Sequence, residues 1–250
     1  MGYSWRRFLK IEETLSFFKG GGKLKKWYIV LLILLVISVS FVALVLAIEE
    51  NSYDLDYFMN SFEENNIVLK TNKSEKELET ISKDIITYLK GKEEPRFLEK
   101  HFNEREVLHM IDVLELFELS RIIKFISGLT ALVIVLFFLK KNSSGLMGKW
   151  LSLGLFANHL LLLILLVLIL VDFTKYFTIF HEIFFSNDLW LLDPRTDLLI
   201  QMLPEPFFVN IAKNIGISFL KYLTIGQVIG YVFYKKGKYK IPHFENLKKL

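Results

Sequence analysis

Two histidines in this chain have surroundings suited to general acid–base chemistry. His109 lies in the polar stretch NEREVLHMID, residues 103–112, and His181 lies in the aromatic stretch 172–208. Histidine has an unperturbed pKa of about 6.5, so a neutral imidazole accepts a proton near neutral pH and the imidazolium returns it. The alternative for either residue alone is a hydrogen-bonded anchor at a membrane surface. Proton transfer at a shared site requires the two rings to lie within about 10 Å, the reach of direct contact or one bridging water.

Four further side chains near these histidines in the sequence could assist such a reaction. Arg105, His109 and Asp112 stand at i, i+4 and i+7, so a helix would show a cation, an imidazole and a carboxylate along one stripe. Asn187 and Trp190 follow the second histidine on a predicted turn. Arg105 and Asn187 are candidate donors to an oxyanion, and Asp112 and Trp190 are candidate orienting residues. The alternatives are a solvated face with an internal Arg105–Asp112 pair and, for Trp190, an interface anchor.

Other reaction classes find little support in the sequence. The two histidines with Asp112 or Glu182 could bind zinc, although their spacing does not single out a metal site. The chain has no cysteine, which excludes thiol catalysis, disulfides and thiolate metal ligands. It also lacks the G-x-S-x-G, H-E-x-x-H, P-loop and glycine-rich nucleotide motifs. We therefore expect neither a metal nor a cofactor.

The elements that must position these residues are membrane helices. Of the 250 residues, 52% are hydrophobic, and the 31 basic and 27 acidic residues are segregated from four long apolar runs. Each run approaches or exceeds the roughly 20 residues that a spanning helix needs. The sequence thus predicts an all-α membrane protein with four transmembrane helices and a helical extracytoplasmic cap. The pI of about 9.0 does not indicate nucleic-acid binding, because the basic residues flank the membrane segments.

Charge asymmetry predicts the orientation of these helices. Segments 1–26, 140–150 and 235–250 carry net charges of +5, +3 and +5, whereas 49–120 and 172–208 carry −9 and −4. Since Lys and Arg accumulate in cytoplasmic loops, both termini are expected in the cytoplasm and both acidic segments outside. The predicted organisation is, in order, a cytoplasmic interfacial helix and hinge (1–26), TM1 (27–48), an extracytoplasmic segment with His109 (49–120), TM2 (121–139), a cytoplasmic loop (140–150), TM3 (151–171), an extracytoplasmic segment with His181 (172–208), TM4 (209–234) and a basic tail (235–250).

Shorter patterns predict how the outer segments are built. Apolar residues at helical spacing indicate a helix over 78–89, which Gly91 and Pro95 end. Asn103 followed by Glu106 predicts a capping box at the start of the helix that carries His109. A 4,3,4 stripe of phenylalanines indicates a helix over 173–184, and Asp193 followed by proline predicts the start of another helix.

Polar and small residues inside the spans are assigned to packing. Asn158 and His159 lie within the third span, where interhelical hydrogen bonds explain them best. Gly226 and Gly230 form a small-xxx-small pair, which allows two helices to approach closely.

Two runs of the sequence resemble the signature segments of the bacterial lipoprotein intramolecular transacylase family. They are FNEREVLHMIDV, 102–113, and FTIFHEIFFSNDLWLLDPRTDLLIQMLPEPFF, 177–208. The run DIITYLKG, 84–91, and the four-span layout with an outer segment of about 70 residues are similar too. The resemblance implies a multi-pass protein of the bacterial cell membrane, with catalytic His109 and His181 facing the extracytoplasmic side.

The resemblance also implies a reaction. The sn-2 acyl chain of a diacylglyceryl lipoprotein moves to the α-amino group of its own N-terminal cysteine, which gives the lyso-form lipoprotein. Neither water nor an external acyl donor is required. The expected partners are the lipoprotein substrate and membrane lipid, and the expected oligomeric state is a monomer.

The two histidines suit this chemistry. An α-amino group has a pKa of about 7.7–8.0, so a base must remove a proton before the nitrogen attacks. A second group can then protonate the departing glyceryl alkoxide. An acyl-histidine intermediate is equally compatible with the sequence.

Two rival functions stay open from the residues alone. One is an outward-facing lipid hydrolase, and the other is a metal-binding or lipid-binding membrane protein without catalysis. The remaining histidines are not expected to act: His101 and His243 lie in polar helix-flanking sequence, and His159 lies within a span.

Overall fold

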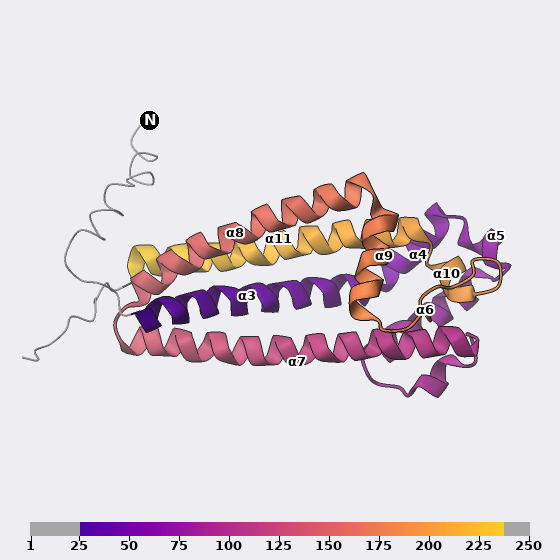
Figure 1. The fold of residues 1–250 in the computed structure, drawn as a ribbon, viewed down its shortest axis with the longest axis horizontal. Helices are drawn as coiled ribbons and strands as arrows, with labels where there is room; N and C mark the ends of the chain where they lie inside the picture. The colour runs from indigo at the N-terminus through magenta and orange to yellow at the C-terminus, as the bar shows by residue number, and fades with distance from the viewer. Residues whose placement is uncertain (1–25, 238–250) are drawn as a thin grey trace, which may run out of the picture.

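The structure is a computed structural model that describes residues 26–237. The interfacial helix predicted for 1–26, most of the basic tail and His243 therefore lie outside the described residues. Four helices in the described part are long and apolar enough to cross a membrane. They are α3 (Lys26–Ser52), α7 (Glu104–Lys140), α8 (Ser144–Val171) and α11 (Glu205–Lys236). Their side-by-side arrangement forms an elongated bundle (Figure 1).

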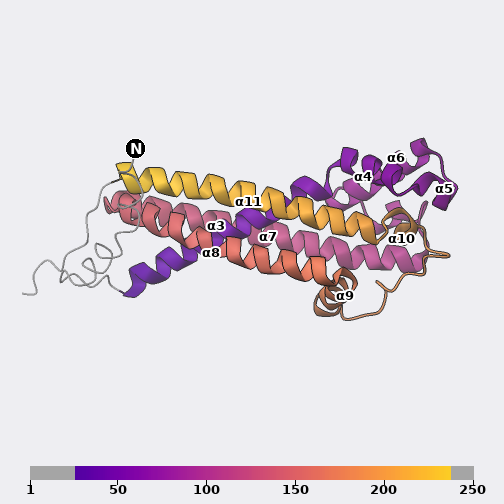
Figure 2. The same cartoon turned by 90° about the horizontal axis from the view of Figure 1, so that it is seen from above.

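Shorter helices gather at one end of this bundle. Figures 1 and 2 show α4, α5, α6 and α10 clustered around the start of α7, while α9 lies across the bundle between the end of α8 and α7. The bounds of these elements are Leu55–Glu64 for α4, Ile67–Thr71 for α5, Glu75–Leu89 for α6, Pro95–Leu98 for the 3-10 helix η1, Phe173–Phe184 for α9 and Leu198–Met202 for α10. The described residues contain no strand.

The bundle helices meet through a core of aliphatic and aromatic side chains. Leu32 and Leu35 of α3, Phe138 of α7 and Leu155 of α8 are completely buried there, as is Leu223 of α11. Exposed leucines, isoleucines and valines cover the outer faces of the same helices, which is the pattern expected where lipid replaces water. The fold is thus an α-helical integral membrane bundle.

The packing of α8 against α11 depends on two glycines. A Cβ atom at Gly148 in α8 would meet the carbonyl oxygen of Gly230 in α11, and one at Gly230 would lie 2.9 Å from the Ser152 nitrogen. The sequence predicted close packing at Gly230, and in the structure the residue that faces it is Gly148. Gly226 instead faces the Leu155 side chain.

A second core organises the end of the bundle where the short helices gather. Phe58, Leu78, Ile85 and Leu98 from residues 49–120 pack with residues of α10 and of the start of α11, including Leu199, Met202 and Phe207. Segments 49–120 and 172–208, distant in sequence, are therefore parts of one packed unit. The start of α7 belongs to this unit, since Val107 and Met110 are buried in the same core.

Local predictions for this end of the bundle are mostly confirmed. Asn103 and Glu106 form the predicted capping box of α7, and this helix continues without a break into the second span. At about 1.5 Å per residue its 37 residues measure about 56 Å, well beyond a hydrocarbon core of about 30 Å. The helix is therefore long enough for its first turns, with His109, to lie outside the hydrocarbon core.

Two boundaries differ from the predictions. The helix expected to start at Asp193 begins later, because Asp197 is the N-cap of α10 and the Asp193 carbonyl accepts the Thr196 and Asp197 amides of a turn. The second difference concerns the helix of the third span, which begins before Leu151. Only residues 141–143 separate α7 from α8, so most of the segment 140–150 is helical.

Candidate active site

The structure brings His109 and His181 together. His109 is in the second turn of α7 and His181 near the end of α9, and their ring centroids are 6.1 Å apart at an interplanar angle of 33°. Their exposed fractions are only 8% and 7%. The proximity expected from the sequence is therefore present, and the two rings form one buried pair near the end of the bundle where the short helices gather.

The hydrogen bond of His181 determines its tautomer. Its Nδ1 lies 2.7 Å from the carbonyl oxygen of Phe177, one turn earlier in α9. Because a carbonyl only accepts, Nδ1 carries the proton and the neutral ring keeps its lone pair on Nε2. The rings of Phe177, Trp190 and Phe185 surround the imidazole at centroid distances of 4.2, 4.9 and 5.4 Å. His181 is thus a neutral base held in an aromatic cage.

His109 has a more apolar environment. Its Nδ1 is buried without a hydrogen-bond partner, and the Phe185 ring packs against the imidazole in a T-shaped arrangement at a centroid distance of 5.3 Å. Burial, reinforced by the neighbouring His181 and opposed by Asp112, lowers the pKa of His109 to about 4. Burial also lowers the pKa of His181, against the effect of its bond to Phe177. Both rings are consequently neutral at pH 7.

The predicted orienting residues connect α7 to the chain that follows α9. Asn187 donates from Nδ2 to Asp112 Oδ2 at 2.9 Å and accepts the Leu189 amide at 3.0 Å. The Arg105 guanidinium donates to the carbonyl of Asp188. The expected alternative of an Arg105–Asp112 pair is therefore wrong, because each residue bonds to the loop instead.

A buried carboxylate near the pair has a role that the sequence did not reveal. Glu106 Oε1 accepts the backbone amide of Leu199 at 2.6 Å, in addition to its capping-box bond. Nearby, Asn103 donates from Nδ2 to Asp197 Oδ1 at 3.0 Å. The capping-box spacing located Glu106 and Asn103, but no local signal indicates partners more than 90 residues away.

Other residues considered from the sequence lie elsewhere. Glu182 is exposed, and within residues 26–237 no three His, Asp or Glu side chains converge as metal ligands. His101 pairs with Asp84 of α6 at 2.7 Å. Asn158 donates to Ser40 across helices as predicted, whereas His159 bonds to the Leu155 carbonyl of its own helix and not across helices.

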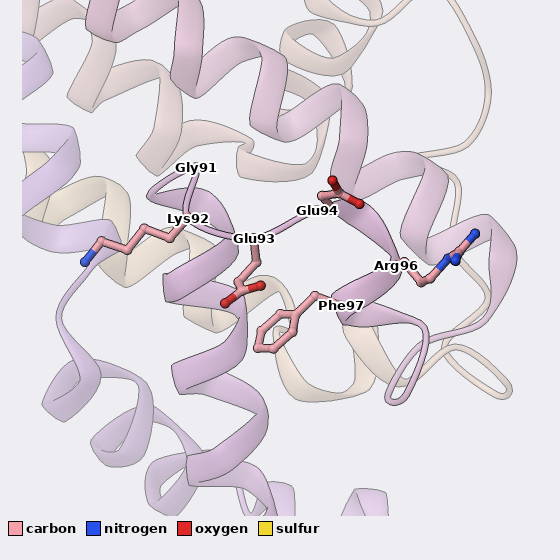
Figure 3. Close-up of a pocket in the computed structure, with 6 residues that line it drawn as sticks. All are labelled: Gly91, Lys92, Glu93, Glu94, Arg96 and Phe97. Carbon is pink, nitrogen blue, oxygen red and sulfur yellow. The ribbon is translucent and has the colours of Figure 1, made fainter.

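A surface hollow is separate from the histidine pair. Figure 3 shows it along the loop after α6, where Lys92, Glu93, Glu94 and Arg96 line it together with Gly91 and Phe97. None of the residues that contact the two histidines lines this hollow. It therefore forms no part of the candidate site.

The fold and the site define an α-helical, four-span membrane protein with a buried histidine pair at one end. Residues 33–208 match the sequence profile of the family described as lipoprotein intramolecular transacylase Lit. This range is more than half of the chain and contains both histidines, so the chain belongs to this family of acyltransferases.

Solved structures share the fold. The chain is similar to the in meso structure of the membrane integral transacylase Lit from Bacillus cereus, with a TM-score of 0.76 and 23% identity over 84% of this chain and 97% of that one. A variant of the same protein with one histidine changed to arginine gives a TM-score of 0.73, with 23% identity over 90% and 97% of the two chains. A search of curated proteins finds no significant match.

Proposed function

We propose that this protein transfers the sn-2 acyl chain of a diacylglyceryl lipoprotein to the α-amino group of the same molecule's N-terminal cysteine. The observation that carries this proposal is the buried pair of neutral imidazoles, 6.1 Å apart, at the end of a membrane bundle. Membership of the transacylase family supports acyl transfer as the reaction class. The product is the lyso-form lipoprotein.

The reaction begins with attack of the cysteine nitrogen on the ester carbonyl carbon. A carbon–nitrogen bond forms, the carbon–oxygen bond to the glyceryl group breaks, and one proton moves from nitrogen to the glyceryl oxygen. His181 is suited to accept this proton because its Nε2 lone pair is free and the Phe177 carbonyl stabilises the resulting imidazolium. His109 lies close enough to share a bound group with His181 and to help return the proton to the alkoxide.

The polar residues around the pair serve the charges that form. Asp112, three residues after His109, offers a carboxylate to the substrate ammonium and holds Asn187 in place. The second amide proton of Asn187 and the remaining donors of Arg105 are available to the oxyanion of the tetrahedral intermediate. Trp190 packs on the His181 ring and keeps its orientation. Because donor and acceptor belong to one molecule, such positioning supplies much of the acceleration.

The acyl chains remain in lipid during this reaction. Phe180, Ile183 and Phe184 on α9 are exposed by 43, 71 and 51%, and α9 follows directly from the apolar end of α8. An amphipathic helix with such a face lies in the membrane interface. The ester is then held beside His181 while its hydrocarbon stays in the bilayer.

The charge asymmetry of the sequence supports a site that faces the extracytoplasmic side. We expect a cysteine in place of Lys92, an exposed residue of the outer domain, to react with an impermeant thiol reagent on intact cells. A cysteine in place of Lys141, exposed in the turn at the other end, should react only after lysis. The absence of native cysteine makes each label unambiguous. Labelling of position 141 on intact cells would contradict this orientation.

The lowered histidine pKa values predict the pH dependence of the reaction. A histidine with a lowered pKa stays neutral, and so able to accept a proton, as the pH falls below 6.5; His109 charges only near pH 4. From about pH 6.5 to 7, above the ordinary histidine pKa, both histidines are neutral, and the substrate amine is therefore the main group that titrates. We expect log(kcat/KM) to rise with a slope near one across this range, measured by initial rates in mixed micelles. A second break near pH 6.5 would show that a histidine titrates with its ordinary pKa.

Mass spectrometry of a synthetic diacylglyceryl lipopeptide tests the proposed reaction. Purified protein in lipid should convert it to a product of unchanged mass that carries one acyl chain on nitrogen and one on glycerol. Release of free fatty acid, with a corresponding loss of mass, would instead establish a lipid hydrolase.

A further inference from the structure

A carboxylate that the proposed reaction does not use is buried one turn before His109. Glu106 has an exposed fraction of 1%, and both of its oxygens accept backbone amides. Oε2 accepts from Asn103 at 2.8 Å and Oε1 accepts from Leu199 at 2.6 Å. The first bond caps α7, and the second joins α7 to α10.

Capping alone does not require this arrangement. The capping box of α6 provides the comparison within the same chain, with Ser74 as N-cap and Glu77 as its partner. There the carboxylate is exposed, and Oε2 alone accepts from both the backbone and the hydroxyl of Ser74. The bond from Glu106 Oε1 to the Leu199 amide is therefore not needed to cap α7.

A second carboxylate strengthens the same junction. Asp197 is exposed by only 6% and accepts from Asn103 Nδ2 through Oδ1 and from the Asp193 amide through Oδ2 at 2.7 Å. Asn103 thus connects both buried carboxylates, with its backbone amide on Glu106 and its side chain on Asp197. The first turn of α7 and the segment 193–199 are joined by polar bonds: the bond between Glu106 and Leu199 is buried, and those of the exposed Asn103 are partly buried.

The segment held in this way leads back to the histidine pair. Asn187, which bonds to Asp112, and Trp190, which packs on His181, lie between the end of α9 and the Glu106 junction. His109 is on α7 itself. The separation of the two imidazoles consequently depends on how firmly this loop is held against α7.

We propose that Glu106 is a positioning residue that holds the loop 187–199 on α7 and thereby sets the geometry of the histidine pair. This role rests on the proposed transacylase function. It requires an ionised carboxylate, because two converging amides need two acceptors. In Glu106→Gln, the side-chain NH2 group would face the backbone N–H of either Asn103 or Leu199. Because both groups are donors, a buried donor would be left unpaired.

The matched experiment compares Glu106→Gln with Glu77→Gln in the full-length protein. Both variants remove a capping-box carboxylate, but only the first breaks the bond to the loop. A misplacement of about 1 Å can cost about 10²-fold in rate. We expect Glu106→Gln to lower kcat for the lipopeptide by about that factor with little change in KM, and Glu77→Gln to match the wild type.

Hydrogen–deuterium exchange gives a readout that does not depend on catalysis. Peptides covering residues 187–203 should exchange faster in Glu106→Gln than in Glu77→Gln, while peptides from the spans exchange alike. Equal rates and equal exchange in the two variants would overturn the proposal, as would a fall in kcat without faster exchange of the loop. If Glu106→Gln does not fold, Asp197→Asn should show a smaller fall in kcat and a smaller increase in exchange over residues 187–203. An Asp197→Asn protein with the kcat and exchange of the wild type would then overturn the proposal. A wild-type protein that forms no lyso-product would refute the proposed function. The exchange data would still test whether Glu106 holds the loop 187–199 on α7.

Discussion

His109→Ala and His181→Ala are each expected to lower the rate of lyso-lipoprotein formation by about 10²–10⁴-fold, the usual cost of a lost general base or acid. The reason is that the two buried rings face one another and His181 has a free Nε2. The loss should appear in kcat, measured with a lipopeptide by mass spectrometry, while membrane expression is retained.

The other described histidines provide the controls. His101→Ala removes a bond to Asp84 of α6, away from the histidine pair, and should leave kcat unchanged. His159→Ala removes a bond to the Leu155 carbonyl within a span and should reduce the yield or activity only in part. A well-expressed His109→Ala or His181→Ala protein that forms full product would show that this assignment of the site is wrong.

Gly148→Ala is expected to cause a large loss of stability. The new methyl group would meet the Gly230 carbonyl and lie 2.5 Å from the Tyr234 backbone nitrogen, so α8 and α11 would have to separate. Overpacking of this kind typically costs about 1–3 kcal/mol, and backbone cannot yield as a side chain does. Thermal unfolding in detergent should give a clearly lower Tm and less folded protein.

Gly128→Ala is the matched control for this change. A Cβ atom at position 128 in α7 would lie 4.0 Å from Val42 Cγ2, an ordinary contact. Its Tm should equal or slightly exceed that of the wild type, because alanine is the better helix former. Equal Tm values for Gly148→Ala and Gly128→Ala would show that α8 and α11 are not packed as described.

The features that the sequence predicted well are those with a local physical signal. Apolar runs define the four membrane helices, because each must satisfy its backbone bonds internally in lipid. The capping box at Asn103 and Glu106 is a pair of residue types at a fixed spacing, and the apolar stripe of α9 is a periodic pattern. Each of these signals lies within a single helix. The approach of His109 to His181 followed from placing both outer segments on the same side of the membrane.

The features that the sequence missed depend on tertiary contacts. Glu106 was predicted only as a cap, because its bond to Leu199 forms when α10 packs on α7. Asp193 matched the pattern of a helix start, but a turn follows it, and Asp197 is the N-cap of α10 instead. Local spacing specifies neither of these outcomes.

Intramolecular transfer is most directly tested by a crossover measurement. Two lipopeptides with different peptide sequences are mixed, and only the first carries a deuterated sn-2 acyl chain. With the purified protein, we expect deuterium on the nitrogen of the first peptide alone. Deuterated acyl chains on the second peptide would show exchange between molecules and would contradict the proposed reaction.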